Sequence, residues 1–270
     1  MDDPLNWSAD DQEQALRAIA PWYDLDFGPL TDDVEMLQGL AVAGQRVLEL
    51  GAGSGRIAAP LAQMGCEVTA VDSSEAMLAV GEPRLKQAGV NVVSADMRCL
   101  HLGAEFDLLV IGLSTFQHLL RRQDQLATLG AARRHLDAGG RLLIDWTAPR
   151  PDDIDPSPPF MQLEWLRRSD SGEMVTKSAG QELAQNRTCG DALDRALSVA
   201  WITYQYDAVD EVGRLRRTLA RFPLRVNLTV GEMAGLLAQS GLRPIDWFGS
   251  WDLAPAGDGD RLIVLAKAAS

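Results

Sequence analysis

A glycine-rich segment with an acid in front of it is the part of this chain best suited to chemistry. Residues 46–55 read Arg-Val-Leu-Glu-Leu-Gly-Ala-Gly-Ser-Gly, a short apolar run that breaks into alternating glycines. Because glycine has no Cβ, Gly51, Gly53 and Gly55 allow a tight turn and let a ligand lie against the backbone. The order strand, glycine turn and helix N-terminus predicts a nucleotide-cofactor site. The alternative is a glycine turn that binds nothing.

The spacing of the glycines separates two kinds of cofactor. In the dinucleotide fingerprint Gly-x-Gly-x-x-Gly/Ala, the third small residue stands six positions into the motif. That position is Arg56 here, and the third glycine comes one residue early, at Gly55. Glu49 stands two residues before the first glycine, where a carboxylate suits an ammonium and a sulfonium and repels a pyrophosphate. The pattern Glu-x-Gly-x-Gly-x-Gly resembles motif I of the class I S-adenosylmethionine (SAM) methyltransferases, and the resemblance covers roughly residues 44–146.

Two more acids follow predicted strands downstream. Residues 67–71 form an apolar run that ends at Asp72, and a carboxylate there can accept hydrogen bonds from both ribose hydroxyls of a nucleoside. NAD and SAM share that ribose, so Asp72 does not choose between them. A third strand over 90–94 leads to Asp96 and Met97, where the family places an acid for the adenine amino group and a side chain against the ring. Taken singly, either acid is a solvated loop carboxylate; three acids at three strand ends favour the cofactor.

The resemblance implies a full set of site residues. The cofactor-binding residues it implies are Tyr23, Glu49, Gly51, Ala52, Gly53, Gly55, Asp72, Ser73, Met77, Asp96, Met97 and Ile111. The resemblance also implies that Phe116 and Arg225 contact the substrate. The alternative for Arg225 is a surface charge at the end of a strand. Related chains often carry Asn where Ser114 stands here.

Two residues are candidates for catalysis. Residues 111–119 lie where the family places the motif nearest the methyl group, and His118 is the histidine best placed as a general base, since imidazole titrates near pH 6.5. The alternative is a histidine that packs structurally in the first turn of the next helix. Related enzymes use an N-terminal Tyr-Asp pair to cover the cofactor, and the resemblance implies this role for Tyr23. The alternative is that Tyr23 anchors the first helix to the core.

Composition narrows the function further. The chain has 270 residues, of which 46% are hydrophobic, and a net charge of −13. Nucleic-acid binding rests mainly on Lys and Arg, so a nucleic-acid substrate is not expected. No apolar stretch reaches the ~18 residues of a membrane span. The acidic N-terminus and three cysteines without metal or disulfide spacing (Cys66, Cys99 and Cys189) lead us to expect a cytoplasmic protein with no metal site.

The elements that must position these residues alternate along the chain. Ser8 is expected to cap a first helix. Helices are predicted over 8–20, 31–40, 56–64, 74–88, 122–136 and 229–240, and core strands over 46–50, 67–71, 90–94, 106–111, 141–145, 242–248 and 261–267. This alternation predicts an α/β fold with a parallel sheet and helices on both faces. The resemblance implies a Rossmann-like, seven-stranded sheet whose last strand is antiparallel.

Composition changes after residue 146. Five prolines fall within residues 148–159, where no regular element is expected. Strand-like pieces follow over 161–168, 173–179, 182–188, 196–207 and 213–222, with a turn over 186–195. We therefore predict a SAM-binding core with an N-terminal helical lid (1–146), an inserted antiparallel β lid subdomain (147–225) and the rest of the core (226–270). Such an insertion resembles small-molecule N- and O-methyltransferases.

Three hypotheses of function follow from the sequence. The favoured one is a SAM-dependent methyltransferase that acts on an amine or hydroxyl of a small metabolite, with a small-molecule acceptor as its partner and a homodimer as the oligomer considered. The second is a non-catalytic SAM-binding regulatory protein. The third is an NAD(P)-dependent oxidoreductase, which Glu49 and Arg56 disfavour.

Overall fold

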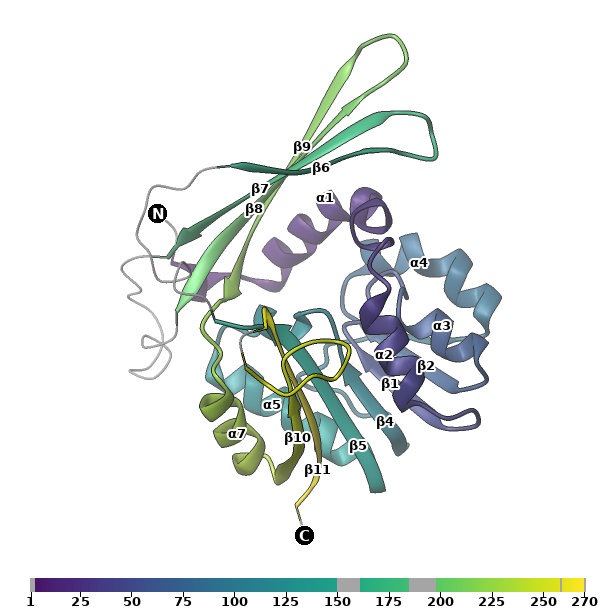
Figure 1. Ribbon diagram of the computed structural model, residues 1–270, viewed down its shortest axis with the longest axis vertical. Coiled ribbons are helices and arrows are strands. Elements are labelled where there is room, and N and C mark those ends of the chain that lie inside the picture. The colour runs from purple at the N-terminus through teal and green to yellow at the C-terminus, as the bar shows by residue number, and fades with distance from the viewer. Residues whose placement is uncertain (1–2, 150–160, 185–197, 258, 270) are drawn as a thin grey trace.

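Two β-sheets form the framework of the protein (Figure 1). The computed structural model describes residues 3–149, 161–184, 198–257 and 259–269. Within them, one sheet has seven strands in the order β10-β11-β5-β4-β1-β2-β3, and the other has four strands in the order β6-β7-β8-β9. The predicted fold class, an α/β core with an additional antiparallel sheet, is confirmed.

The seven-stranded sheet follows the apolar runs of the sequence closely. Its strands are β1 (Arg46–Leu50), β2 (Glu67–Asp72), β3 (Asn91–Ser94), β4 (Phe106–Ile111), β5 (Leu136–Thr147), β10 (Leu242–Phe248) and β11 (Arg261–Ala268). The first five run parallel to one another, whereas β11 is antiparallel to both β5 and β10, as expected. β5 begins about five residues before the predicted start, because its first part continues directly from the preceding helix.

Helices cover both faces of this sheet. They are α2 (Asp32–Leu40), α3 (Ala58–Gln63), α4 (Glu75–Ala88), α5 (Arg122–His135) and α7 (Val230–Gln239), with a 3₁₀ turn η2 (Thr115–His118) after β4. On one face α5 and α7 pack against Leu48 and Leu50 of β1; on the other, α2, α3 and α4 pack against Val47. Successive strand residues point to opposite faces, and apolar residues on both faces explain why β1 reads as an apolar run without alternation.

The N-terminal helix α1 (Ala9–Phe27) is longer than predicted. It follows a short 3₁₀ turn, η1 (Pro4–Asn6), and Ser8 caps it in a reciprocal pair with Asp11. The predicted end at residue 20 was wrong: the helix continues through Pro21, because Trp22 and Asp26 in its last turns are buried against the four-stranded sheet. Figure 1 shows α1 lying beneath that sheet.

The four-stranded sheet consists of β6 (Gln162–Arg168), β7 (Met174–Leu183), β8 (Val199–Val209) and β9 (Leu215–Arg225), all antiparallel. The two pieces predicted over 173–179 and 182–188 are one strand as far as Leu183. The predicted turn over 186–195 lies outside the described residues, as does nearly all of the proline-rich segment. Ile202 and Phe222 of this sheet pack on Ala15 and Ile19 of α1. The division at residues 146 and 225 stays a prediction.

Among the helices of the described residues, none combines the length and the apolar character of a membrane-spanning segment.

A single glycine lets α4 pack against the glycine turn. A Cβ on Gly81 would lie 2.4 Å from the carbonyl oxygen of Ser54, which is backbone and cannot rotate away. Helix α4 therefore packs directly against the backbone of the glycine turn.

We expect Gly81→Ala to lower the free energy of unfolding by about 1–3 kcal/mol, the usual cost of forcing an extra carbon into a packed site. Urea unfolding followed by circular dichroism measures it. Gly235→Ala in α7 is the matched control, because a Cβ added there would have no atom within 4 Å and alanine is the better helix former. Equal stabilities of the two variants would contradict the packing described for α4.

Candidate active site

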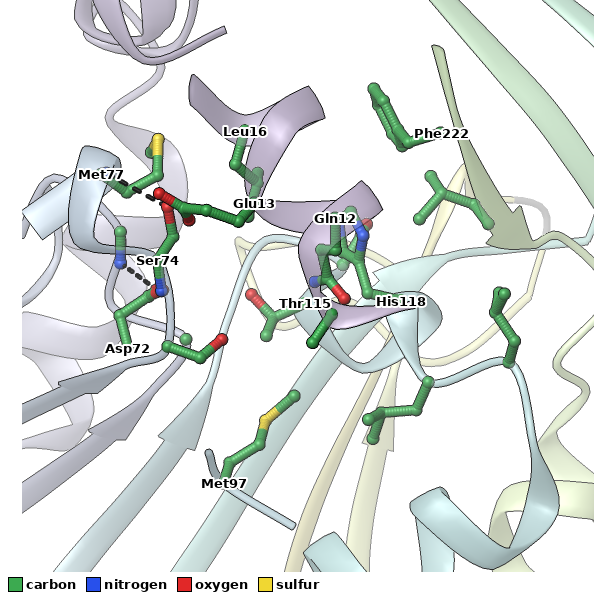
Figure 2. A pocket seen from close by; sticks show the side chains of 18 of the residues that line it. Gln12, Glu13, Leu16, Asp72, Ser74, Met77, Met97, Thr115, His118 and Phe222 are labelled. Carbon is green, nitrogen blue, oxygen red and sulfur yellow. Dashed lines mark hydrogen bonds between the residues drawn. The ribbon is translucent and has the colours of Figure 1, made fainter. Parts of the chain in front are cut away.

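A cavity of about 420 Å³ lies at the carboxyl ends of the parallel strands, within the size range of small-molecule sites, ~300–1,000 Å³. Its floor comes from the segments that follow β1 to β5. Its roof comes from α1 and from Tyr204, Phe222 and Leu224 of the four-stranded sheet. Figure 2 shows Gln12, Glu13 and Leu16 of α1 on one side and Asp72 and Met97 on the other. Two sheets and a helix that are far apart in sequence thus enclose one site.

The glycine turn forms part of the cavity wall. Gly51 and Gly53 line the cavity and have φ angles of +78° and +55°, in the left-handed region that favours glycine. A Cβ on Gly51 would lie 2.2 Å from Thr115 Cγ2. Gly55 and Ala52 do not line the cavity: a Cβ on Gly55 would collide with Leu85 of α4, and Ala52 belongs to the core. The turn is therefore shaped for close approach from the cavity side at Gly51 and Gly53.

Asp72 forms part of the cavity floor. Its Oδ2 accepts a hydrogen bond from Gly53 N (2.7 Å) and its Oδ1 accepts one from Ser74 N (2.8 Å). Burial raises the pKa of this carboxyl, opposed by these hydrogen bonds. Ser73 and Met77, for which the resemblance implies cofactor binding, line the cavity beside it. An ionised carboxylate has about four acceptor sites, so Asp72 can also accept a hydrogen bond from a ligand hydroxyl.

Asp96 and Met97 follow β3 and also line the cavity. Arg98 binds the Asp96 carboxylate through Nε (3.0 and 2.9 Å) and Nη2 (2.6 Å). Partial burial acts in the other direction, but the bonds from Arg98 hold the pKa of Asp96 below its ordinary value. Asp96 is therefore a carboxylate, fixed in place by a neighbour that the sequence reading did not consider.

Glu49 does not line the cavity, contrary to expectation. It lies on the same face of β1 as Val47, is 2% exposed, and accepts a hydrogen bond from the backbone of Ala58 while its Oε2 has no partner among the described residues. Burial raises its pKa to about 8 despite the nearby Arg56. Near pH 7 Glu49 is therefore mostly a neutral acid beneath the glycine turn.

This burial gives a pH-dependent stability. Between the ordinary glutamate pKa of 4.5 and about 8, folded Glu49 keeps a proton that the unfolded chain releases, so its contribution to stability falls as pH rises. We expect the free energy of unfolding of the wild type, relative to Glu49→Gln, to decrease by at most about 1.4 kcal/mol per pH unit across that window. Urea unfolding of both proteins at pH 5, 6, 7 and 8 tests it; parallel pH curves would contradict the buried, protonated Glu49.

Arg56, at the position where dinucleotide sites have a small residue, has a structural role. Its guanidinium is buried, donates to the carbonyl of Leu30 (2.7 Å) and pairs with Asp33 of α2 through both terminal nitrogens. The arginine therefore ties α2 to the segment after the glycine turn.

Tyr23 and Asp24 of α1 have different roles. Tyr23 lines the cavity with its ring 4.9 Å from that of Phe27, and burial raises its pKa, so the phenol stays protonated. Asp24 instead accepts hydrogen bonds from Ser54 Oγ (2.7 Å) and Arg84 Nη2 (2.6 Å). Asp24 thus holds α1 on the glycine turn, and Tyr23 is presented to the cavity from there.

His118 ends η2 and lines the cavity, with its ring stacked on Phe222 at 5.7 Å. No hydrogen bond to this ring is found among the described residues. Desolvation lowers its pKa to about 4, so the expected titration near 6.5 is wrong for this position. Just before it, Leu113 and Ser114 have φ angles of +46° and +62°, and such strained backbone clusters at functional sites.

Ile111, Phe116 and Arg225 lie outside the cavity, against expectation. Ile111 and Phe116 are fully buried in the main core. Arg225 is 1% exposed and donates to Gln125 Oε1 (3.0 Å) and Glu232 Oε1 (2.6 Å), so it joins α5 to the start of α7 and has no access to an acceptor.

Several lining residues were missed by the sequence reading. On α1 they recur at helical spacing, and periodicity could have found them once α1 was known to cover the site: Gln12, Glu13, Leu16 and Ile19. Arg261 reaches the cavity from the start of β11, donating to Ser114 Oγ (3.0 Å) and pairing with Asp145. Its distance along the chain from the other lining residues leaves no signal in the sequence.

The comparisons with known proteins agree with this geometry. Residues 47–140 match the family model of a methyltransferase domain. The chain is similar to the cypemycin N-terminal methyltransferase of a Streptomyces species, with 34% identity over 106 residues, 39% of this chain and 43% of that protein. The chain spans about half the length of the curated relatives it matches.

Solved structures extend the likeness over nearly the whole chain. The CcbJ methyltransferase from Streptomyces caelestis gives a TM-score of 0.72 at 22% identity, covering 93% of this chain and 96% of that one. SAM-bound CalS10 from Micromonospora echinaspora gives 0.64 at 21% identity, covering 97% and 99%. At these identities the likeness concerns the fold, including the four-stranded sheet.

The chain has the fold of solved class I methyltransferases. Residues 47–140 are its methyltransferase domain, and the sequence-based resemblance to SAM-dependent small-molecule methyltransferases is confirmed, together with SAM as the cofactor of this class. The dinucleotide alternative is left without support.

Proposed function

We propose that this protein is an enzyme that transfers a methyl group from SAM to an amine or hydroxyl of a small metabolite. The observation that carries the proposal is the shape of the cavity. One end of the cavity carries the glycine turn, Asp72 and Met97, and the other end carries His118 and Phe222. A cofactor at the first end and an acceptor at the second would meet in one enclosed space.

The residues of the first end fit SAM. Gly51 and Gly53 line the cavity without a side chain, so a ligand can lie against their backbone. Asp72 offers a carboxylate acceptor to the ribose, and Asp96 and Met97 suit the adenine. The chemistry that SAM supplies when bound is a methyl group on a positively charged sulfur.

The residues of this chain then position the methyl acceptor and provide a group that can take its proton. In-line displacement depends chiefly on holding nucleophile, carbon and leaving group on one line. Helix α1, Tyr204 and Phe222 form the roof of the cavity and would hold the acceptor in that position. Only an acceptor that must lose a proton needs a base. Desolvation lowers the pKa of His118 to about 4, so its ring is neutral above about pH 5 and can accept a proton, although it is a weaker base than an ordinary histidine. We assign it the role of general base.

The names of the relatives cover both kinds of acceptor, since several curated relatives are called ubiquinone biosynthesis O-methyltransferases. One relative is called an N-terminal methyltransferase and the solved CalS10 an amino pentose methyltransferase. We further propose a homodimer that acts in the cytoplasm, with the lid subdomain bounded by residues 147 and 225.

Transfer of a labelled methyl group tests the proposal. Purified protein is incubated with methyl-labelled SAM and a small-molecule metabolite extract, and the products are separated by mass. We expect label in one or a few small molecules, and much less label with Asp72→Ala at SAM concentrations that do not saturate the variant. Binding of SAM without transfer to any fraction would favour the non-catalytic, regulatory alternative and overturn the enzymatic proposal.

A further inference from the structure

Glu13 of α1 lines the cavity, and only one of its two carboxylate oxygens accepts a hydrogen bond among the described residues. Its Oε1 accepts hydrogen bonds from Ala76 N (3.3 Å) and from Arg17 (3.2 Å). Its Oε2 is buried and has no hydrogen-bond partner among the described residues. The Glu13 side chain as a whole is 27% exposed and lines the cavity, so this unused oxygen is an acceptor that a ligand in the cavity can bind.

Glu13 and Asp72 both contact the start of α4. Both carboxylates bind backbone N–H groups at the start of the same helix: Asp72 binds Ser74 N and Glu13 binds Ala76 N. Both line the cavity, and Glu13 adds to the electrostatic cost of ionising Asp72. Figure 2 shows the Glu13 side chain reaching from α1 toward Ser74 and Met77, on the side of the cavity where Asp72 lies. Two carboxylates facing one space suit a ligand with two neighbouring O–H donors.

We propose that Glu13 and Asp72 share the ribose diol of the cofactor, with one hydroxyl donating to Glu13 Oε2 and the other to Asp72. This inference rests on the proposed function, because it takes SAM as the cofactor. It makes α1 part of the nucleoside site. The ribose would then lie between the lid helix and the end of β2, and loading of the cofactor would stabilise α1 over the cavity.

Binding of two nucleosides by Glu13→Gln tests the proposal. Isothermal titration calorimetry is done with S-adenosylhomocysteine (SAH) and with 5′-methylthioadenosine, which keeps the ribose and adenine but lacks the amino acid. We expect Glu13→Gln to weaken both by the same factor, about 10-fold, for the loss of one charge-assisted hydrogen bond. Arg17→Ala is the control: it removes the exposed partner of Glu13 outside the cavity and is expected to change neither affinity.

Analogues of 5′-methylthioadenosine that lack the 2′- or the 3′-hydroxyl identify the contact. For one of them, Glu13→Gln should cause no further loss of affinity, because the hydroxyl that Glu13 binds is already missing. A loss for SAH alone would place Glu13 at the amino-acid end, and unchanged affinity for both nucleosides would leave it a structural cap of α4; either overturns the proposal. Should Glu13→Gln melt well below the wild type, Glu13→Asp takes its place, with the same expectations. Wild-type protein that binds neither nucleoside would overturn the proposed function itself.

Discussion

Asp72→Ala is expected to weaken SAH binding by about 10–100-fold, because a charge-assisted hydrogen bond contributes about 1.5–3 kcal/mol and 1.4 kcal/mol is tenfold in affinity. The variant removes the acceptor for the ribose and also the acceptor for Gly53 N and Ser74 N, which Asp72 holds at 2.7 and 2.8 Å. The glycine turn and the start of α4 would therefore lose their common anchor. Isothermal titration calorimetry measures the effect.

Asp107→Ala is the matched control for this variant. Asp107 also binds a backbone N–H, that of Arg46 at 2.7 Å, but does not line the cavity. It should bind SAH like the wild type. Unchanged affinity in Asp72→Ala, with the control also unchanged, would show that the nucleoside does not lie at the end of β2.

His118→Ala is expected to lower kcat by about 10²–10⁴, the usual contribution of a general base, while SAH affinity stays near that of the wild type. The pH profile carries a second expectation. Because the pKa of His118 is about 4, the wild-type rate should show no histidine limb near pH 6.5, and a limb that belongs to this ring should appear only near pH 4 and vanish in the variant. Initial rates with the methyl acceptor from pH 4 to 9 measure both.

Two other variants separate catalysis from packing. His101→Ala changes an exposed histidine and should leave kcat unchanged. Tyr23→Phe removes one hydroxyl from the cavity wall and should alter cofactor orientation without changing the limb near pH 4. A His118→Ala enzyme with wild-type kcat would mean that positioning alone accounts for catalysis and that the acceptor arrives already deprotonated.

Apolar runs made the strands of the core predictable. β1 and β4 begin and end where the sequence placed them, and Gly51, Gly53 and Asp72 were found because each follows a strand end. In a parallel sheet those ends meet at one edge, so local sequence was enough to assemble the floor of the site.

The roof could not be predicted in the same way. Tyr204 and Phe222 face the cavity only because their sheet folds back over α1, a long-range packing that no local pattern encodes. The end of α1 was misjudged for the same reason: Asp26, five residues past Pro21, is held by Tyr206 and Lys177 of that sheet.

Side-chain direction explains the remaining errors. Glu49 was placed beside the cofactor from its position in the motif, but strand alternation turns it to the face of Val47, beneath the cavity. Arg225 was placed at the acceptor from its position before the last core helix, whereas its guanidinium is taken by Gln125 and Glu232. Charged residues of this kind can be read as functional or structural until their partners are known.

Titration of the wild-type protein with SAH and, separately, with NADH is the measurement that tests the central claim most directly, since the whole account rests on a SAM-type nucleoside occupying the cavity between α1 and the strand ends. We predict binding of one SAH per chain by isothermal titration calorimetry, lost or strongly weakened in Asp72→Ala, and no detectable heat with NADH. Saturable binding of NADH, or no binding of SAH by correctly folded protein, would contradict the account.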